Sequence, residues 1–311
     1  MMPKAGPDKV FTVVIPARNA EVFIEETLHS LAVQTLREFV AYIIDDGSTD
    51  LTASVVQAFI NNSGDARFVL LEGPAKGVSA ARNAGLELAK TRYVLFLDAD
   101  DLLASDALER FTNKLDNTED VAALGLILRI AQDGTPLVSH DNRDLVPVNN
   151  QLAGLIRKNY IVNGGALAIR TEVLKAREGY SEDLKFGEDW EFWCRVLLEG
   201  QLSVVSGGPV LSYRQISTGA NNLANASVFA REVPCLERVS HNLDIQNRFG
   251  GDLQKMIRAR RIDVFWSGVR SRFQYGAKSS AMLIALAGLF VYPDSFTRPD
   301  LALRFIKSLR G

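Results

Sequence analysis

The sequence predicts an α/β fold built on a mostly parallel sheet. Four apolar runs typical of buried strands alternate with three helical segments within about 90 residues of the amino-terminal part. Such alternation is typical of βαβ units, whose right-handed crossovers keep the strands parallel. In open sheets of this kind, ligands bind beyond the carboxyl ends of the strands. Polar loops follow these strand ends, so we expect a ligand site there.

Turn chemistry supports each of these elements. The first strand, Val10–Ile15, is expected to end at Pro16, because proline cannot donate to a strand ladder. After the second strand, Gly47 permits a tight turn and Ser48–Asp50 can cap the next helix. The expected elements are strands at 10–15, 39–44, 67–71 and 92–97, and helices at about 23–32, 51–60 and 78–89.

The alternation loosens after the fourth strand. Gln132–Asn150 is polar and rich in turn residues, which is typical of a surface excursion, and the Gly164-Gly165 pair permits close approach of backbone to a ligand or another chain. Beyond Asn221 the chain is expected to be helical, with breaks near Gly250-Gly251 and Pro293. The other expected elements are helices at 104–115 and 187–198 and strands at 121–130, 164–169, 204–205 and 210–214.

Charge is distributed unevenly along the 311 residues, whose formal net charge is −2. Residues 226–311 contain 14 Lys and Arg against 7 Asp and Glu, a net charge of +7, which leaves −9 for residues 1–225. An acidic first part suits a metal-binding enzyme, and a basic tail suits an anionic partner such as a membrane surface. We therefore expect two domains, 1–225 and 226–311.

Several functional classes are excluded by missing motifs. No Gly-x-Gly-x-x-Gly follows the first strand, which argues against a nicotinamide or flavin enzyme, and no Walker motif indicates a P-loop NTPase. An EF-hand loop beginning at Asp98 would need glycine where Leu103 stands. The two cysteines are too few for a metal cluster or a disulfide framework.

The chain is expected to be cytoplasmic. Residues Met1–Lys9 lack the apolar run of a signal peptide. The longest apolar run, Ala281–Tyr292, has 12 residues and is shorter than the ~20 that span a bilayer.

Three carboxylates follow the fourth strand, at Asp98, Asp100 and Asp101. Hard oxygen ligands one residue apart at a strand end suit Mg²⁺ or Mn²⁺ carrying a phosphorylated substrate. A solvated acidic loop is the alternative interpretation, because an Asp-x-Asp pair recurs by chance.

Five short motifs follow one another along the chain. They are Ile15–Glu21 (Ile-Pro-Ala-Arg-Asn-Ala-Glu), Asp45–Asp50 (Asp-Asp-Gly-Ser-Thr-Asp), Gly77–Gly85, Leu97–Asp101 and Glu188-Asp189. In this order and at this spacing they resemble the motifs of family-2 glycosyltransferases. The resemblance covers roughly residues 10–215 and leaves the helical tail outside. It implies the GT-A fold, a mostly parallel sheet flanked by helices, here with a C-terminal helical extension, and an inverting transfer from a nucleotide-diphosphate sugar.

Roles for individual residues follow from this resemblance. Asp46 is expected to accept a hydrogen bond from the base, typically uracil, Asp100 to ligate a metal ion that bridges the diphosphate, and Asp189 to be the catalytic base. The expected nucleotide-sugar-binding residues are Pro16, Arg18, Asn19, Glu21, Asp46, Arg82, Asp98, Ala99 and Asp100.

The sequence departs from the family pattern at two places. Many relatives have an aromatic residue at the Arg18 position, where a guanidinium face can replace ring stacking. Many also have a histidine two residues after an arginine near the last short strand, but the run here is Tyr213–Ile216, Tyr-Arg-Gln-Ile. Metal ligation would then depend on Asp100, the phosphates and water.

Each assigned residue also has a structural interpretation. Asp46 can cap a turn, Arg82 can pair with a surface acid, and Asp189 can be a first-turn acid favoured by the helix dipole. Trp190 and Trp193 are more typical of core packing than of a sugar platform.

The resulting hypothesis is a metal-dependent, hexosyltransferase-like enzyme of bacterial surface polysaccharide synthesis. It would use a UDP-linked sugar, with Mg²⁺ or Mn²⁺ as cofactor, and a glycan or lipid-linked acceptor, and no nucleic-acid partner is expected. A sugar-phosphate nucleotidyltransferase would need a Gly-rich loop in place of Pro16–Glu21. A catalytically silent nucleotide-sugar-binding or scaffold protein would be expected to lack Asp100 or Asp189, and both are present.

The basic tail has three interpretations. Its helices can dock on the inner face of the membrane through anionic lipid, where a lipid-linked acceptor would be found. They can form a homodimer contact instead, or pack on the catalytic domain.

Overall fold

A computed structural model describes residues 9–137, 143–216, 228–274 and 278–293. The chain divides into two compact units. The first unit comprises Met1–Leu155, Asn159–Asp183 and Glu188–Gln215, and the second comprises Ile156–Lys158, Leu184–Gly187 and Ile216–Gly311. The predicted boundary between residues 225 and 226 lies outside the described residues, so the two-domain assignment stays a prediction.

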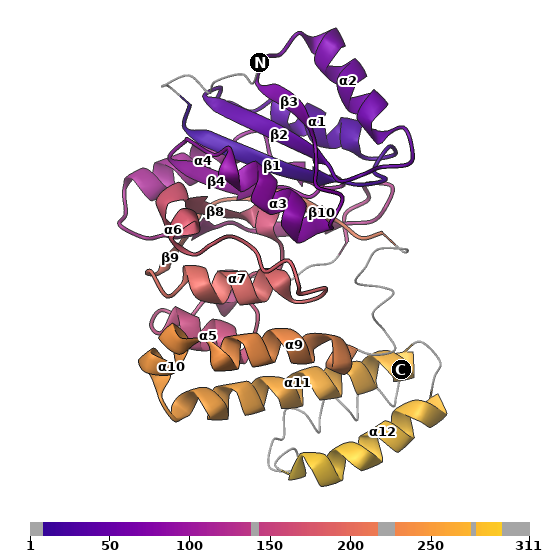
Figure 1. The fold of residues 1–311 in the computed structure, drawn as a ribbon, viewed down its shortest axis with the longest axis vertical. Coiled ribbons are helices and arrows are strands. Elements are labelled where there is room, and N and C mark those ends of the chain that lie inside the picture. Colours follow the sequence, from indigo (N-terminus) through magenta and orange to yellow (C-terminus); the bar gives the residue numbers. More distant parts are fainter. Residues whose placement is uncertain (1–8, 138–142, 217–227, 275–277, 294–311) are drawn as a thin grey trace. The chain divides into compact units, whose positions relative to one another are not determined.

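The first unit is built on a seven-stranded sheet with the order β3-β2-β1-β4-β8-β6-β9 (Figure 1). The strands β1 to β4 are parallel, β8 is antiparallel to β4 and β6, and β9 is parallel to β6. The predicted mostly parallel α/β sheet is thus confirmed. The strands are β1 Phe11–Ala17, β2 Phe39–Asp45, β3 Phe68–Glu72, β4 Tyr93–Phe96, β6 Ala122–Leu124, β8 Leu167–Arg170 and β9 Leu202–Val204.

Helices pack around this sheet (Figure 1). Their apolar faces cover strands whose residues are buried, as on α1, where Ile24, Leu28 and Leu31 are fully buried. Helix α3 approaches β1 closely, because a Cβ atom on Gly85 would lie 2.4 Å from a methyl carbon of Val14. The helices are α1 Ile24–Ala32, α2 Thr52–Ser63, α3 Val78–Glu87, α4 Ala107–Asp116, α5 Gln151–Arg157, α6 Thr171–Ala176 and α7 Glu188–Val196, with 3-10 turns at Arg143–Leu145 and Gly164–Ala166.

Strand β1 continues through Pro16, where the sequence predicted its end. Pro16 pairs with Ile44 of β2, and the pairing of β1 with β4 ends at Val14 opposite Phe96. Carbonyl groups of odd-numbered β1 residues face β2, as in the bond from Asp46 N to Ala17 O. Even-numbered residues such as Pro16 therefore face β4, which has already ended at this position. The absence of an N–H group on Pro16 thus costs the sheet no hydrogen bond.

The predicted strand at 121–130 is wrong, because the chain splits there into two strands of different sheets. Its second half, β7 Ile127–Ile130, belongs to a three-stranded sheet with β5 Leu102–Leu103 and β10 Leu211–Arg214, in the order β5-β10-β7. At Gly125 a Cβ atom would lie 2.2 Å from a methyl carbon of Val210. This close approach bends the chain from one sheet to the other.

The described residues of the second unit beyond residue 227 are mostly helical, as predicted for this part of the chain. Gly250, with φ of 53°, separates α10 from α11, where the sequence indicated a break. Cys235, Leu236, Leu253 and Met256 are buried in its interior. Within the described residues, no helix is both long and apolar enough to cross a bilayer. The helices are α9 Val228–His241, α10 Leu243–Phe249, α11 Asp252–Gln274 and α12 Lys278–Val291.

Candidate functional site

The loops after β1 and β2 are joined by hydrogen bonds that use two of the predicted site residues. Asn19 Oδ1 accepts from Thr49 N at 2.9 Å, and Glu21 Oε2 accepts from Leu51 N at 2.7 Å. The strands place these loops next to each other, because Ala17 pairs with Asp45 at their carboxyl ends. Asn19 and Glu21 therefore give the β1 loop its shape.

Pro16 and Arg18 lie beside this junction. Pro16 is half-buried, and Arg18 is exposed and can reach a ligand. Asp46 is buried, and its two carboxylate oxygens accept hydrogen bonds from Lys76 N at 3.2 Å and Gly77 N at 2.7 Å. These bonds hold the loop that leads into α3. The contacts of Asp46 in the structure are therefore those of a residue that caps a turn. Its bond to a base stays a prediction.

Arg82 connects residues that are far apart in the sequence. Its guanidinium donates to Asp189 Oδ1 through Nη1 and to Asp98 Oδ1 through Nη2, each at 2.8 Å. Glu188 lies 3.6 Å from Nη1, and the ring of Tyr180 lies 5.1 Å from the guanidinium carbon. Asp189, the predicted catalytic base, and Asp98, a predicted nucleotide-sugar-binding residue, thus meet at one arginine, which is only 5% exposed.

The charges around Arg82 do not balance. Three carboxylates surround one guanidinium, and burial and the neighbouring Glu188 and Asp98 raise the pKa of Asp189 to about 7, although Arg82 opposes this shift. The side chain of Asp189 is still 31% exposed, so a ligand can reach it. A reachable carboxylate whose pKa lies near neutrality can accept a proton from a hydroxyl group.

Asn83 positions the segment that covers Arg82. Its Nδ2 donates to Tyr180 O at 2.9 Å, and its Oδ1 accepts from Tyr180 N at 2.7 Å. The amide thus fixes the backbone of Tyr180, whose buried ring faces Arg82. Sequence reasoning assigned no role to Asn83 or Tyr180, although Asn83 stands next to Arg82 in a recognised motif.

The two carboxylates after Ala99 have different surroundings. Asp101 is fully buried and accepts from Asn163 Nδ2 at 2.7 Å and from Arg214 N at 2.8 Å. Asp100 is partly exposed, and burial together with the charge of Asp98 raises its pKa to about 6. Asp101 therefore stabilises the loop, and Asp100 is the carboxylate with capacity for a ligand. Ala99 is buried, and its carbonyl accepts from Thr27 Oγ1 at 3.0 Å.

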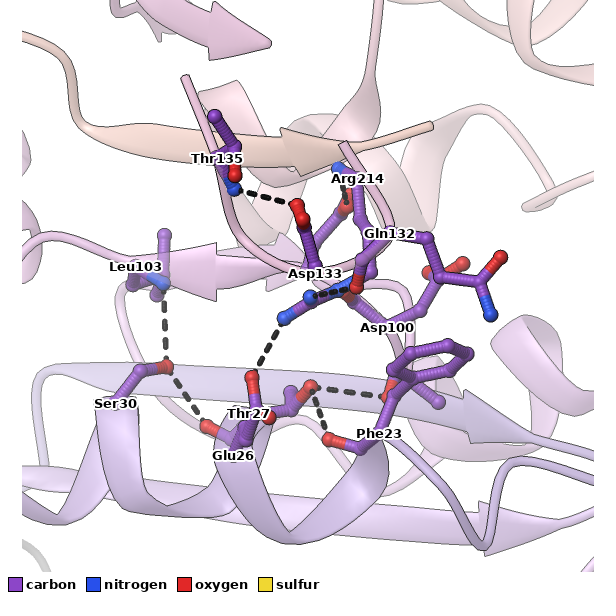
Figure 2. Close-up of polar contacts among 12 residues, drawn as sticks. Phe23, Glu26, Thr27, Ser30, Asp100, Leu103, Gln132, Asp133, Thr135 and Arg214 are labelled. Carbon is purple, nitrogen blue, oxygen red and sulfur yellow. Dashed lines mark hydrogen bonds and ion pairs between the residues drawn. The ribbon is translucent and has the colours of Figure 1, made fainter. Parts of the chain in front are cut away.

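Arg214 fastens the loop of Asp100 from β10, as Figure 2 shows. Its Nε donates to Asp100 O at 2.9 Å, its Nη1 to Gln132 O at 2.7 Å, and its Nη2 to Glu26 Oε2 at 2.6 Å. In the sequence, the run Tyr213–Ile216 was of interest only because it lacks the histidine that many relatives have there. The arginine itself holds α1, the carboxylate loop and the segment after β7 together.

The donor set suits a divalent cation that also binds phosphate oxygens. Within the described part of the chain, no group of three or more His, Cys, Asp or Glu side chains could hold a metal by itself. Asp100 is a hard oxygen donor whose ionised form is disfavoured by the nearby Asp98, and a cation would relieve that repulsion. The residues fit a cation shared with a bound diphosphate.

The structure also contains a cavity of about 540 Å³ away from this site. Its lining includes Tyr93 and Arg170, which pair at the beginning of β4 and the end of β8. Asp98 and Asp100 follow the other end of β4, so this cavity is separate from the carboxylates. Trp190 and Trp193 are also no part of a sugar platform, because both are buried, as predicted.

The family model for glycosyl transferase family 2 matches residues 12–177. The chain is 28% identical over 187 residues to EpsJ, an uncharacterized glycosyltransferase of Bacillus subtilis (strain 168), which covers 58% of this chain and 54% of EpsJ. It is also 28% identical over 202 residues to TarS, a poly(ribitol-phosphate) beta-N-acetylglucosaminyltransferase of Staphylococcus aureus (strain Mu50), which covers 63% of this chain and 34% of TarS. The chain thus spans about half or less of the length of these curated relatives.

Two solved structures share the fold. Residues 1–349 of S. aureus TarS in complex with UDP-GlcNAc match with a TM-score of 0.64 and 20% identity, over 84% of this chain and 81% of that chain. Mannosyltransferase PcManGT from Pyrobaculum calidifontis in complex with GDP-Man and Mn²⁺ matches with a TM-score of 0.62 and 19% identity, over 99% of this chain and 88% of that chain. The fold is therefore of the GT-A type, as the motifs implied.

Proposed function

The chain belongs to glycosyl transferase family 2, and on that premise we propose that it transfers a sugar, with inversion, from a UDP-linked donor to a hydroxyl group of a glycan or lipid-linked acceptor. The observation that carries this proposal is the arginine bridge: Arg82 binds Asp98 and Asp189 at once. This contact joins two acidic motifs that lie about 90 residues apart in the sequence, which supports assigning both to one site.

Asp189 is the proposed general base. Its Oδ1 accepts from Arg82, which leaves Oδ2 to take the proton of the acceptor hydroxyl. The acceptor oxygen then bonds to the anomeric carbon, and the bond from that carbon to the diphosphate oxygen breaks with its electron pair. One displacement of this kind inverts the configuration and needs no covalent enzyme intermediate.

Asp100 is the proposed metal ligand. Mg²⁺ or Mn²⁺, when bound, would supply Lewis-acid neutralisation of charge on the departing diphosphate. Asp101 and Arg214 keep the backbone of Asp100 in place by bonds to buried partners. The supporting observations are the donor type, the raised pKa of Asp100 and the likeness to a fold that was solved with Mn²⁺.

The UDP-linked donor is proposed from the motifs, because the fold alone does not select a base. The two similar structures hold UDP-GlcNAc and GDP-Man. The base would bind at the joined loops of β1 and β2, which contain Pro16 and the exposed Arg18 next to the hydrogen-bonded Asn19 and Glu21. A cytoplasmic location and a role in surface polysaccharide synthesis complete the proposal.

A panel of nucleotides tests the proposed donor class. Thermal unfolding would be followed with UDP, GDP, CDP and ADP, each with and without Mn²⁺, and slow hydrolysis of the matching nucleotide sugars would be assayed. We expect a metal-dependent rise in Tm with UDP and hydrolysis of UDP-sugars only. A response to GDP alone would reject the UDP donor and retain the transferase. If no nucleotide raises the Tm and no nucleotide sugar is hydrolysed, the proposal that the protein is a glycosyltransferase is rejected.

A further inference from the structure

Helix α12 packs with its small residues inward and its large apolar residues outward. Ala281, Ala285 and Tyr292 are buried in a cluster with Ile262, Trp266 and Val269 of α11. Figure 1 shows α12 beside α11. The opposite face of α12 is between 47% and 89% exposed and consists of Met282, Leu283, Leu286, Phe290 and Val291.

The close approach of the two helices explains this arrangement. A Cβ atom on Gly288 would lie 2.1 Å from a ring carbon of Phe265, so only glycine fits there. Together with Ala281 and Ala285 it forms a seam at helical spacing, one residue for each turn. Among the described large apolar side chains of α12, Ile284 packs partly against this cluster, and the five exposed ones do not. A soluble helix would normally bury such residues and expose polar ones.

Basic groups lie near the carboxyl end of α12. Arg258 and Arg261 of α11 lie close enough to the Tyr292 hydroxyl to lower its pKa, against the larger effect of burial, which raises it. Residues 252–291 carry seven Lys and Arg against two Asp, and α12 itself has no acidic residue. The pair of helices α11 and α12 therefore combines an exposed apolar face with a net positive charge.

We propose that the outward face of α12 inserts into the headgroup boundary of an anionic lipid membrane, with Arg258 and Arg261 bound to lipid phosphates beside it. A helix of 14 residues lies in the interface and does not span the bilayer. The positive charge of this region favours anionic lipid over protein as the partner of the exposed α12 face. A second copy would bring a second extension of net charge +7, and residues 294–311 carry four Lys and Arg against two Asp, so both protein partners repeat the positive sign.

Flotation of the full chain with vesicles tests this proposal without reference to transfer activity. The vesicles would be phosphatidylcholine alone and phosphatidylcholine with about one third phosphatidylglycerol. We expect the protein to float with the mixed vesicles and to bind them at least about tenfold more weakly after Leu283→Gln, Leu286→Gln and Phe290→Gln combined. The pair Arg258→Gln and Arg261→Gln should weaken binding about 25-fold, at roughly fivefold for each charge, and only on the anionic vesicles.

A matched control changes three exposed apolar residues elsewhere, Val33→Gln, Val148→Gln and Leu243→Gln, which are 61% to 86% exposed. This variant should float like the unchanged protein, and circular dichroism should show that every variant remains folded. Two outcomes would overturn the proposal: no flotation of the unchanged protein with either vesicle, or equal flotation of the α12 variant. The proposal would also be overturned if the unchanged protein bound no lipid and formed a dimer in solution that the α12 substitutions dissociate. The exposed face would then contact a second copy of the chain.

Discussion

Arg82 and Arg214 hold the same carboxylate loop through different kinds of atom. Both are buried, 5% and 4% exposed. Arg82 binds side-chain carboxylates, those of Asp98 and Asp189, and is surrounded by excess negative charge. Arg214 binds two backbone carbonyls, of Asp100 and Gln132, and one carboxylate, that of Glu26. Arg214 therefore determines the path of the loop, and Arg82 determines the charge of the groups that face a ligand.

The comparison separates residues that act on substrate from residues that maintain structure. The carboxylates of Asp98 and Asp189, which bind Arg82, remain reachable, and the pKa of Asp189 is raised to about 7. Asp101, whose carboxylate accepts from the backbone N–H of Arg214, is fully buried with defined donors. We expect substitutions around Arg82 to reduce transfer and substitutions around Arg214 to reduce stability.

The largest expected effect is that of Asp189→Asn. It removes the proposed base and should lower kcat about 1,000-fold, within the usual contribution of general-base catalysis. Initial rates with a UDP-sugar, together with the Tm shift caused by UDP, would measure the change. Asp106→Asn, an exposed acid of the same unit, is the control and should leave both unchanged. If UDP binding is lost together with the rate, Asp189 has a structural role.

Arg214→Met should lower the free energy of unfolding by about 3 kcal/mol, because it removes a buried guanidinium that donates three hydrogen bonds, to Asp100 O, Gln132 O and Glu26 Oε2. Urea denaturation would measure this loss, with the exposed Arg37→Met as control. The residual folded protein should bind UDP less well, because the loop of Asp100 is released. An unfolding free energy within about 0.5 kcal/mol of the unchanged protein would contradict the role of Arg214.

Substitution of the adjacent Asp100 and Asp101 should affect different properties, metal-dependent binding for the first and stability for the second. Asp100→Asn should weaken the Mn²⁺-dependent part of UDP binding about tenfold and should not lower stability, because burial and Asp98 already disfavour the charge of Asp100. Asp101→Asn should lower the free energy of unfolding by about 2 kcal/mol, since it disturbs two buried hydrogen bonds. Calorimetric titration of UDP with and without Mn²⁺, followed by urea denaturation, would separate the two. Equal behaviour of both variants would remove the distinction drawn between them.

A further expected effect is on the pH dependence of stability. The pKa of Asp189 is about 7 and that of Asp100 about 6 in the folded chain, above the ordinary value of 3.8. The folded state therefore binds more protons than the unfolded state between about pH 4 and pH 7, and stability should fall as the pH rises through that window. Activity should change in the opposite direction, because the base must be ionised. In metal-free buffer, Asp189→Asn should flatten the stability profile, and an unchanged profile would contradict the raised pKa.

The sequence by itself determined the order of strands and helices in the amino-terminal part and the positions of the acidic motifs. Both depend on local properties: the period of apolar residues and the residues that permit turns. Even here the prediction that β1 ends at Pro16 is wrong. Proline lacks only the N–H that would bond to β4, and β4 has already ended at that position.

Only the tertiary structure decided which polar groups meet. Arg82 binds Asp98 sixteen residues away and Asp189 107 residues away, and no local pattern records such a pairing. The same holds for the split of the predicted strand at Gly125 and for the outward face of α12, where one glycine against Phe265 determines which side of the helix is covered. Close packing between segments far apart in the chain fixes these features, because each depends on the shape of a neighbour that the local sequence does not contain.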